Sequence, residues 1–290
     1  MIPETYSPAA NFQALCCAEL GLGTQRRVFS VTDSPDLVMK VAIASPYANW
    51  VEYLIYSCLA NTNNPAAHTL GQVLSISACG CFLMMERLDD VCGSLTGAPF
   101  PRWLSDRKRS AFGRNRRGGI KIRDYGAVNL SGIIAQETYR PAAAPVPRVS
   151  PLGADSDYVA LIGDKIGEHA GRDMHAVIGY PHHILKVCNG SYRANFVELI
   201  VYAALDQLNA AELSSFARVE ISRSGKYLLA EGRTDVPVAF DDALPVAPTW
   251  LSPPLIGDFG LDSTGRAKIR HFADIAFEKL FGGAQLLQMS

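Results

Sequence analysis

The 290-residue sequence lacks several features that mark whole classes of proteins. It has no run of apolar residues long enough to span a bilayer, so we expect no membrane partner. Its N-terminal segment has no basic flank followed by an apolar stretch, so we expect no signal peptide. The formal net charge is only -1, so no overall field selects nucleic acid or an acidic surface. These absences predict a cytoplasmic protein.

The cysteines lack the paired spacing of a zinc site. There are seven of them, an odd number, and Cys79 and Cys81 form a C-x-C pair without a second pair. In a chain without an export signal, we expect these thiols to be reduced. Apolar material is plentiful instead, because 48% of the residues are hydrophobic. That composition is enough for a globular core.

The sequence contains an internal repeat at an offset of 146 residues, the separation of Lys40 and Lys186. It predicts two related units, residues 1–140 and 155–290, joined by a Pro- and Ala-rich linker at 141–154. The identities without a gap are Lys40 and Lys186, Val41 and Val187, Ser45 and Ser191, Ala48 and Ala194, Asn49 and Asn195, Val51 and Val197, Glu52 and Glu198, Tyr56 and Tyr202, and Leu59 and Leu205.

Both units show the same order of expected elements, which predicts an α+β fold with an internal duplication. Each has an apolar strand, a helix with an apolar stripe, and then a β-hairpin. Asn49 and Asn195 are expected to cap the helices, and residues 271–289 to form an amphipathic C-terminal helix. The expected strands are 36–43 and 182–188, the helices 49–60 and 195–208, and the hairpins 71–88 and 217–233.

The repeated charges suggest a specific chemistry. A buried ammonium destabilises the fold unless it is paired. We therefore expect the strand lysine to face the helix glutamate, which offsets that cost. An Asp in a turn before Gly can hold a divalent cation. Lys, Glu and Asp in this order are the parts of a phosphoryl-transfer site. The candidates are Lys40, Glu52 and Asp124 in the first unit and Lys186, Glu198 and Asp258 in the second.

In these motifs the sequence resembles the protein kinase-like superfamily. "VMKVA" and "ILKVC" are similar to the strand that carries the family's lysine, and Glu52 and Glu198 to its C-helix glutamate. "FLMMERL" and "YLLAEGR" resemble the hinge, and "RDYGAVN" and "GDFGLDS" the magnesium-binding turn. The resemblance implies two small kinase-like units, each an N-lobe-like antiparallel sheet with a C-helix.

The resemblance also implies ligands and roles. ATP would bind with Lys40 or Lys186 on its phosphates, while Glu52 or Glu198 holds the lysine. Magnesium would bind Asp124 or Asp258. The catalytic residue would be Asp106, which would orient a Ser or Thr hydroxyl of the substrate.

The sequence departs from the family pattern at three places. The segment before Lys40 has Gly21 and Gly23 but no third glycine of a G-x-G-x-x-G loop. Ala111 stands where the family has a metal-binding Asn, five residues after Asp106. The stretch between hinge and metal-binding turn leaves little room for the large-lobe helices that usually precede the catalytic loop. These departures favour a pseudokinase over an enzyme.

One stretch, residues 102–123, is strongly basic and has no counterpart in the second unit. With Trp103 and Phe112 interleaved, its composition is typical of a site for nucleic acid or an acidic partner, and equally of a solvated loop. The candidate partner-binding residues are Arg107, Lys108, Arg109, Arg114, Arg116 and Arg117.

Three functions therefore stay open. The first is a tandem pseudokinase that binds a protein partner and inhibits or scaffolds it, as a viral or bacterial effector would. The second is an active ATP-dependent Ser/Thr protein kinase. The third is nucleic-acid binding through residues 102–123, which would show a steep salt dependence.

Overall fold

The computed structural model describes residues 2–95, 98–101, 103–128, 153–208, 210–237, 244–275 and 286–288. Its contacts divide the chain into two compact units, Met1–Ile133 with Phe281–Ser290, and Ile134–Leu280. The expected linker at 141–154 lies outside the described residues except for its last two. The C-terminal end of the chain departs from the expected second unit, 155–290. Its strand β17 (Leu286–Gln288) pairs with β6 (Pro99–Pro101) of unit 1.

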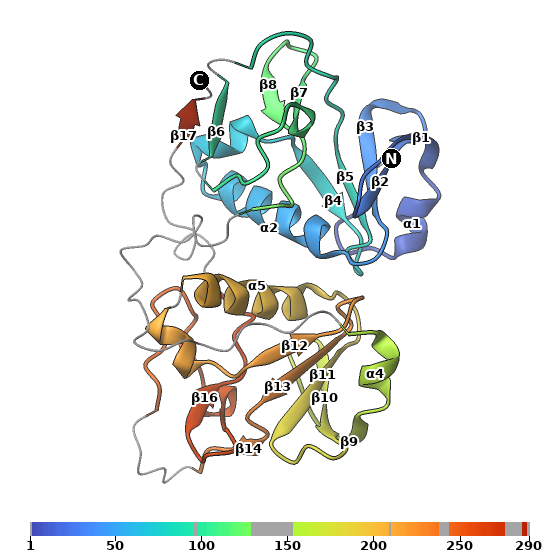
Figure 1. The fold of residues 1–290 in the computed structure, drawn as a ribbon. Coiled ribbons are helices and arrows are strands. Elements are labelled where there is room, and N and C mark those ends of the chain that lie inside the picture. The colour runs from blue at the N-terminus through green and yellow to red at the C-terminus, as the bar shows by residue number, and fades with distance from the viewer. Residues whose placement is uncertain are drawn as a thin grey trace. The chain divides into compact units, whose positions relative to one another are not determined.

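Unit 1 is built on a five-stranded antiparallel sheet with one long helix against it (Figure 1). The sheet order is β1-β2-β3-β5-β4, and β7 and β8 form a separate hairpin. In chain order its elements are α1 (Ala9–Gln13), β1 (Cys16–Leu22), β2 (Arg26–Val31), β3 (Ser34–Ala42), α2 (Tyr47–Asn61), β4 (Val73–Ile76), β5 (Phe82–Glu86), β6, β7 (Phe112–Arg114) and β8 (Ile120–Ile122).

Unit 2 has the same sheet order, β9-β10-β11-β13-β12, and the small sheet β14-β15-β16 contains its second hairpin. Helix α5 packs against this sheet as α2 does in unit 1 (Figure 1). In chain order its elements are α4 (Asp155–Val159), β9 (Ile162–His169), β10 (Arg172–Val177), β11 (His183–Cys188), α5 (Arg193–Gln207), β12 (Val219–Ile221), β13 (Tyr227–Glu231), β14 (Thr234–Asp235), β15 (Phe259–Leu261) and β16 (Ala267–Ile269).

The central strand of each sheet separates two packing regions, because side chains alternate along a strand. On one face of β3, Met39 packs in a buried cluster with Phe12, Val31 and Met84. Neighbouring Lys40 is also buried, only 6% exposed, although it carries a charge. The sheet thus holds a lysine in the interior next to α2.

The structure confirms the α+β class, the expected strands, the helices expected near 49–60 and 195–208, and both hairpins, whose turns lie at Gly80 and Gly225. The prediction that Asn49 and Asn195 cap the helices is wrong. Each helix starts two residues earlier, at Tyr47 and Arg193, and each Asn is fully buried inside it. The Asn side chains bond backbone carbonyls of the hairpin turns instead.

The expected helix at 271–289 is also absent from the part of it that the structure describes. Residues 271–274 form no regular element, and Ile275 makes an isolated bridge to Leu251. Phe272 and Ala273 are buried without belonging to any helix or strand. No helix among the described residues is long and apolar enough to cross a membrane.

Candidate functional site

The buried ion pair of unit 1 joins the central strand to the long helix. Lys40 on β3 donates to both carboxylate oxygens of Glu52 on α2, at 3.0 and 2.8 Å. The carboxylate of Glu52 is fully buried. Lys40 also donates to the backbone carbonyl of Arg123. The lysine therefore ties helix, sheet and the segment after β8 together.

The Asp-Tyr-Gly turn after β8 closes over this pair. The backbone N–H groups of Tyr125 and Gly126 donate to Glu52 Oε1 at 2.9 and 3.0 Å. The Tyr125 hydroxyl donates to the carbonyl of Gly71 at 2.8 Å, which fixes the turn from its other side. Glu52 is thus the acceptor that positions the neighbouring Asp124.

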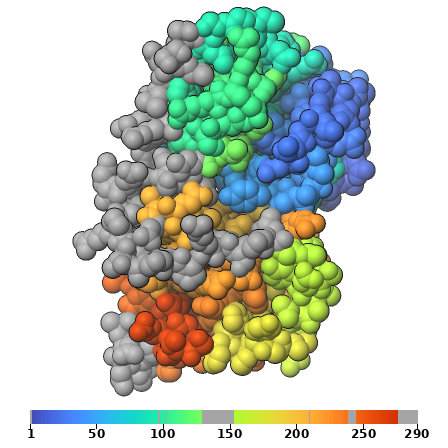
Figure 2. All heavy atoms as spheres, in the orientation of Figure 1, coloured from blue at the N-terminus to red at the C-terminus, as the bar shows by residue number. Residues whose placement is uncertain are grey.

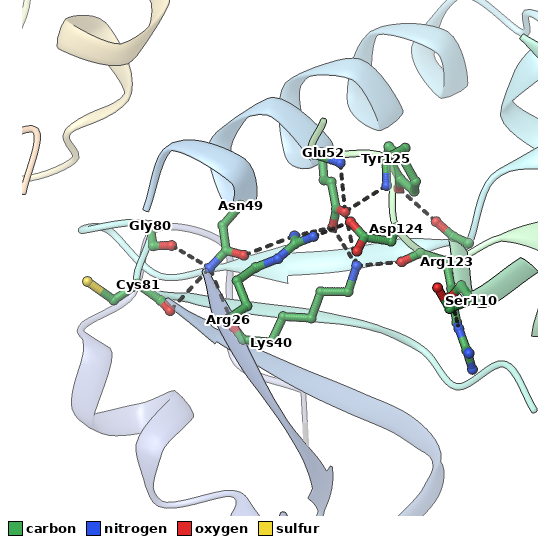
Figure 3. A network of polar contacts seen from close by, with 12 residues as sticks. Arg26, Lys40, Asn49, Glu52, Gly80, Cys81, Ser110, Arg123, Asp124 and Tyr125 are labelled. Carbon is green, nitrogen blue, oxygen red and sulfur yellow. Dashed lines mark hydrogen bonds and ion pairs between the residues drawn. The ribbon is translucent and has the colours of Figure 1, made fainter. Parts of the chain in front are cut away.

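A second cation, Arg26 at the start of β2, enters the same network (Figure 3). Its Nη1 lies 2.9 Å from Glu52 Oε2, and its Nη2 forms an ion pair with Asp124. Nη1 also lies 3.5 Å from Asn49 Oδ1. Arg26 therefore bridges the carboxylates of the helix and of the Asp-Tyr-Gly turn.

The unit 1 network has equal numbers of positive and negative side chains. Burial and the nearby Arg26 lower the pKa of Lys40 from its ordinary value. Burial acts to raise the pKa of Asp124, but Lys40 and Arg26 together lower it below its ordinary value. Burial acts against the charge of Arg26 too, yet Glu52 and Asp124 raise its pKa. These shifts favour the charged forms of Asp124 and Arg26.

The candidate catalytic residue, Asp106, lies before the β7–β8 hairpin. Its Oδ2 is 2.8 Å from the ammonium of Lys108, and its Oδ1 accepts from the Lys108 amide at 3.3 Å. This hydrogen bond and the charges of Asp106 and Asp124 raise the pKa of Lys108. The structure therefore pairs Lys108 with Asp106, and Lys108 is also affected by the charge of Asp124.

Unit 2 forms the corresponding pair with still greater burial. Lys186 Nζ lies 2.7 Å from Glu198 Oε2, and Arg172 Nη2 lies 2.9 Å from Glu198 Oε1. All three side chains are fully buried. The Phe272 amide donates to Glu198 at 3.3 Å, and Lys186 donates to the Arg270 carbonyl. Arg172 lies at the start of β10, as Arg26 does on β2.

The backbone of unit 2 puts a histidine where unit 1 has Asp124. In unit 1 the Asp124 amide donates to the carbonyl of Ala111 at 3.3 Å. In unit 2 the His271 amide donates to the carbonyl of Asp258, also at 3.3 Å. His271 therefore corresponds to Asp124, and Asp258 to Ala111.

The structure places Asp258 differently from the expected metal ligand beside Lys186. Its carboxylate accepts from the Leu255 amide at 2.7 Å and lies 3.7 Å from His169 Nε2. The motif letters match Asp124, but Asp258 belongs to the turn before β15 rather than the turn after β16. The carboxylate of Asp258 thus organises its own loop.

Unit 2 holds two cations against one carboxylate. Arginine keeps its proton in proteins, so the surplus positive charge disfavours the proton of Lys186 instead. Burial lowers the pKa of Lys186 to about 7, with Arg172 and Arg270 adding to the shift against the attraction of Glu198. Burial, with Lys186 nearby, also lowers the pKa of His271 far below its ordinary value, so this ring is neutral.

The basic stretch is partly neutralised within unit 1, where its segment forms much of the visible surface (green in Figure 2). Arg116 pairs with Asp36, and Arg123 lies 2.7 Å from Asp90. The guanidinium of Arg107 lies 4.8 Å from the centre of the Phe100 ring, and Lys108 pairs with Asp106. Arg109 donates to the Gly93 carbonyl, and Arg114 donates to the Gly118 carbonyl. The backbone amide of Arg117 donates to Asn115.

The two arginines that contact the buried glutamates, Arg26 and Arg172, were not predicted from the sequence. Arg26 and Arg172 share the offset of 146 that relates Lys40 to Lys186, which is a signal in the sequence. They lie outside the ungapped block of identities. A comparison of charged residues at this fixed offset would have found them.

The residues at the site do not fit a magnesium ion as they are arranged. Asp124 is occupied by a guanidinium, and Ala111 has no side-chain oxygen. Among the described residues no group of three or more His, Cys, Asp or Glu side chains is placed to hold a metal. No protein-family model and no curated protein matches the sequence.

Proposed function

We propose that the chain is a tandem pseudokinase-like protein, a duplicated pair of small kinase-like units that binds a protein partner and inhibits or scaffolds it. The observation that carries this proposal is the guanidinium of Arg26 between Glu52 and Asp124. A phosphotransferase needs its metal-binding carboxylate free for the cation that bridges the nucleotide phosphates. Here an internal cation already neutralises that carboxylate.

Unit 2 supports the same proposal more strongly. His271 stands at the place of Asp124 and is neutral, so it supplies no negative charge for a cation. Pro253 lies five residues before Asp258, as Asp106 lies five before Ala111. Unit 2 therefore carries neither of the two carboxylates on which phosphoryl transfer depends.

The sequence after the Asp-Tyr-Gly turn also favours a binding platform. Only residues 127–154 separate this turn from α4 of unit 2, whereas the large lobe of the resembled family follows such a turn. A small lobe without the large lobe keeps its lysine–glutamate pair and its fold, but it has no substrate site. The proposal places the protein in the cytoplasm, where its seven free cysteines stay reduced.

A second function, protein kinase activity of unit 1, is favoured by one observation. Lys108 pairs with Asp106, the candidate catalytic carboxylate two residues before it, and is also affected by the charge of Asp124. Such a cluster is the minimum needed to orient a hydroxyl and neutralise a transferred phosphoryl group.

A nucleotide titration separates the two functions. The melting temperature is measured with no addition, with ATP alone, and with MgATP at millimolar concentration. The pseudokinase proposal expects no stabilisation that depends on magnesium. It also expects no transfer of labelled phosphate to itself or to a generic Ser/Thr substrate.

Labelled product from wild type that is lost in Asp106→Ala would overturn the proposal and establish the kinase. Lys165→Ala is a suitable control, because this exposed lysine of unit 2 pairs only with Glu168 and Asp173 among its described ion pairs. Its substitution should leave any activity of unit 1 unchanged.

A further inference from the structure

One extended segment of unit 2 is exposed, whereas its counterpart in unit 1 is covered by another strand. We propose that residues 244–248 of unit 2 are a docking site for an extended apolar segment of a partner protein, which adds to them as a β-strand. This inference rests on the proposed function, because it names the surface and the chemistry of the partner that such a protein binds.

The segment corresponds to strand β6 of unit 1 at an offset of 147 residues, the separation of Pro101 and Pro248. The Leu104 amide donates to the Pro101 carbonyl at 3.1 Å, and the Leu251 amide donates to the Pro248 carbonyl at 3.0 Å. The same offset relates the buried Trp103 to Trp250, and the isolated bridge Leu104–Val128 to Leu251–Ile275.

In unit 1 the C-terminal strand covers this segment. Strand β17 pairs antiparallel with β6, and Leu287 lies opposite Phe100 (β17 in red beside β6, Figure 1). Phe100 supplies the only backbone N–H of β6, because both of its neighbours in the strand are proline. Phe100 is only 4% exposed. Unit 1 thus shows which kind of chain binds here, an extended one with a leucine at its centre.

In unit 2 the counterpart of Phe100 is Ala247, and among the described residues no strand pairs with it. The amides of Val246 and Ala247 donate to no backbone carbonyl of the described residues. Val246 is 88% exposed and Leu244 is 36% exposed. Since alternate residues of an extended chain face the same side, these two side chains form one apolar row. The segment therefore offers both backbone donors and apolar surface to a strand.

Two prolines keep the segment extended. Pro245 and Pro248 have a fixed φ, and a residue that precedes proline is restricted to extended backbone. Residues 244–248 accordingly form no helix or turn. The chain that follows is anchored by Trp250, which is fully buried and stacks on Phe216 with ring centres 5.6 Å apart. A docking strand would thus meet a preorganised partner, which lowers the entropy lost on binding.

A second copy of this chain fits the site less well than another protein. The strand available for exchange is β17, which already pairs with β6 in its own unit 1. Its transfer to unit 2 of another copy would uncover Phe100 and would add no pairing overall. A net gain of backbone hydrogen bonds and buried apolar surface therefore requires a strand from a different protein.

The probe is a synthetic, fluorophore-labelled peptide of residues 282–290, titrated with the full-length protein and followed by fluorescence anisotropy. It contains Leu287, the residue that lies opposite Phe100 in unit 1. We expect saturable binding below millimolar concentration. The same peptide with Leu287→Pro should bind about tenfold more weakly, because it lacks the central amide for strand pairing.

Two substitutions in the protein locate the bound peptide. Ala247→Pro removes an amide that donates to no backbone carbonyl of the described residues, so the melting temperature should be retained while binding weakens about tenfold. Val246→Glu places a charge in the apolar row and should also weaken binding. Val159→Glu is the matched control, because Val159 is 49% exposed but lies on α4, and its binding should equal that of wild type.

Absence of saturable binding at millimolar peptide would overturn the docking site. Equal binding to wild type and Ala247→Pro would also overturn it, because the peptide would then be exchanging with β17 on β6. A dimer that forms with rising protein concentration and is lost in Ala247→Pro would refute the choice of a different protein as partner. These results are independent of the nucleotide titration and the label transfer, which decide the proposed function separately.

Discussion

Arg26 joins Glu52 and Asp124 through one guanidinium group, with Nη1 2.9 Å from Glu52 and Nη2 paired with Asp124. The side chain of Arg26 is 9% exposed and that of Glu52 is fully buried, whereas 42% of the Asp124 side chain is exposed. Two carboxylates and two cations thus balance from the interior of unit 1 to its edge. This bridge is what distinguishes the site from one prepared for a divalent cation.

Replacement of this bridge should destabilise unit 1 and uncover a cation site. In Arg26→Ala, Glu52 and Asp124 would face Lys40 alone, and loss of one partner of a buried charge pair costs about 3 kcal/mol. We expect a reduction of that size in the free energy of unfolding, measured with urea. We also expect Mn²⁺ to raise the melting temperature of this variant but not of wild type.

Arg27→Ala is the matched control, because this neighbouring arginine is half exposed and pairs with Glu19 at the surface. Its loss should change the unfolding free energy by less than about 1 kcal/mol. Equal effects of the two substitutions would contradict the role assigned to Arg26. A variant that loses stability as expected but gains no response to Mn²⁺ would limit that role to stability.

The two buried lysines should differ in their contribution to stability. Lys40→Met would leave Glu52 and Asp124 opposed by Arg26 alone, with an expected loss of about 3 kcal/mol. Lys186→Met would leave Arg172 and Glu198 as a matched pair, and replacement of a surplus buried charge by an apolar side chain is often neutral or stabilising. Urea unfolding of the two variants tests this order, and a larger loss in Lys186→Met would refute it.

The stability of unit 2 should fall in mild acid because of His271. Burial lowers its pKa in the folded state, so the unfolded state binds the proton more readily and stability is lost as pH falls below about 6.5. One such group contributes about 1.4 kcal/mol per pH unit. Groups that face the ring and oppose its protonation include Lys186, His169, Arg172 and Arg270.

His271→Phe isolates this contribution, because phenylalanine retains an aromatic ring and both ring nitrogens of His271 are buried without a hydrogen-bond partner among the described residues. We expect the variant to unfold at a higher urea concentration and to show a flatter dependence on pH between 5 and about 6.5. A slope equal to that of wild type would assign the acid sensitivity to other groups.

Two glycines of unit 2 separate backbone strain from steric clash. Gly225 and Gly179 have positive φ angles of +86° and +79°, so alanine is strained at both. A Cβ on Gly225 would lie 2.0 Å from the Phe196 ring, whereas a Cβ on Gly179 meets nothing within 4 Å. We expect a loss of about 1 kcal/mol in Gly179→Ala and a clearly larger loss in Gly225→Ala, both measured by thermal unfolding.

The sequence predicted those parts of the site that depend on local patterns. The repeated charges and the cost of an unpaired buried ammonium predicted that Lys40 on its strand faces Glu52 on its helix, and the structure forms that ion pair. The repeat supplied the second pair, Lys186 with Glu198. Both inferences needed only neighbouring residues and a fixed offset.

The parts of the site that the sequence did not predict depend on how strands pair in the folded chain. Arg26 reaches Glu52 only because β2 pairs with β3 in a register that turns this side chain toward α2. The equivalence of His271 with Asp124 is set by hydrogen bonds at the ends of two hairpins. The Asp-Phe-Gly motif predicted that Asp258 lies beside Lys186, but Asp258 belongs to the turn before β15. A short turn before a strand and one after it can share a sequence.

The spacing of the two units changes along the chain. Gly80 and Gly225 are 145 residues apart, whereas Ala111 and Asp258 are 147 apart, so two residues were gained or lost between these points. Under the proposed duplication, that interval contains Asp106 of unit 1 and Pro253 of unit 2. The segments that differ in length by two residues are thus the ones that contain these two positions, while both units share the buried Lys–Glu–Arg frame.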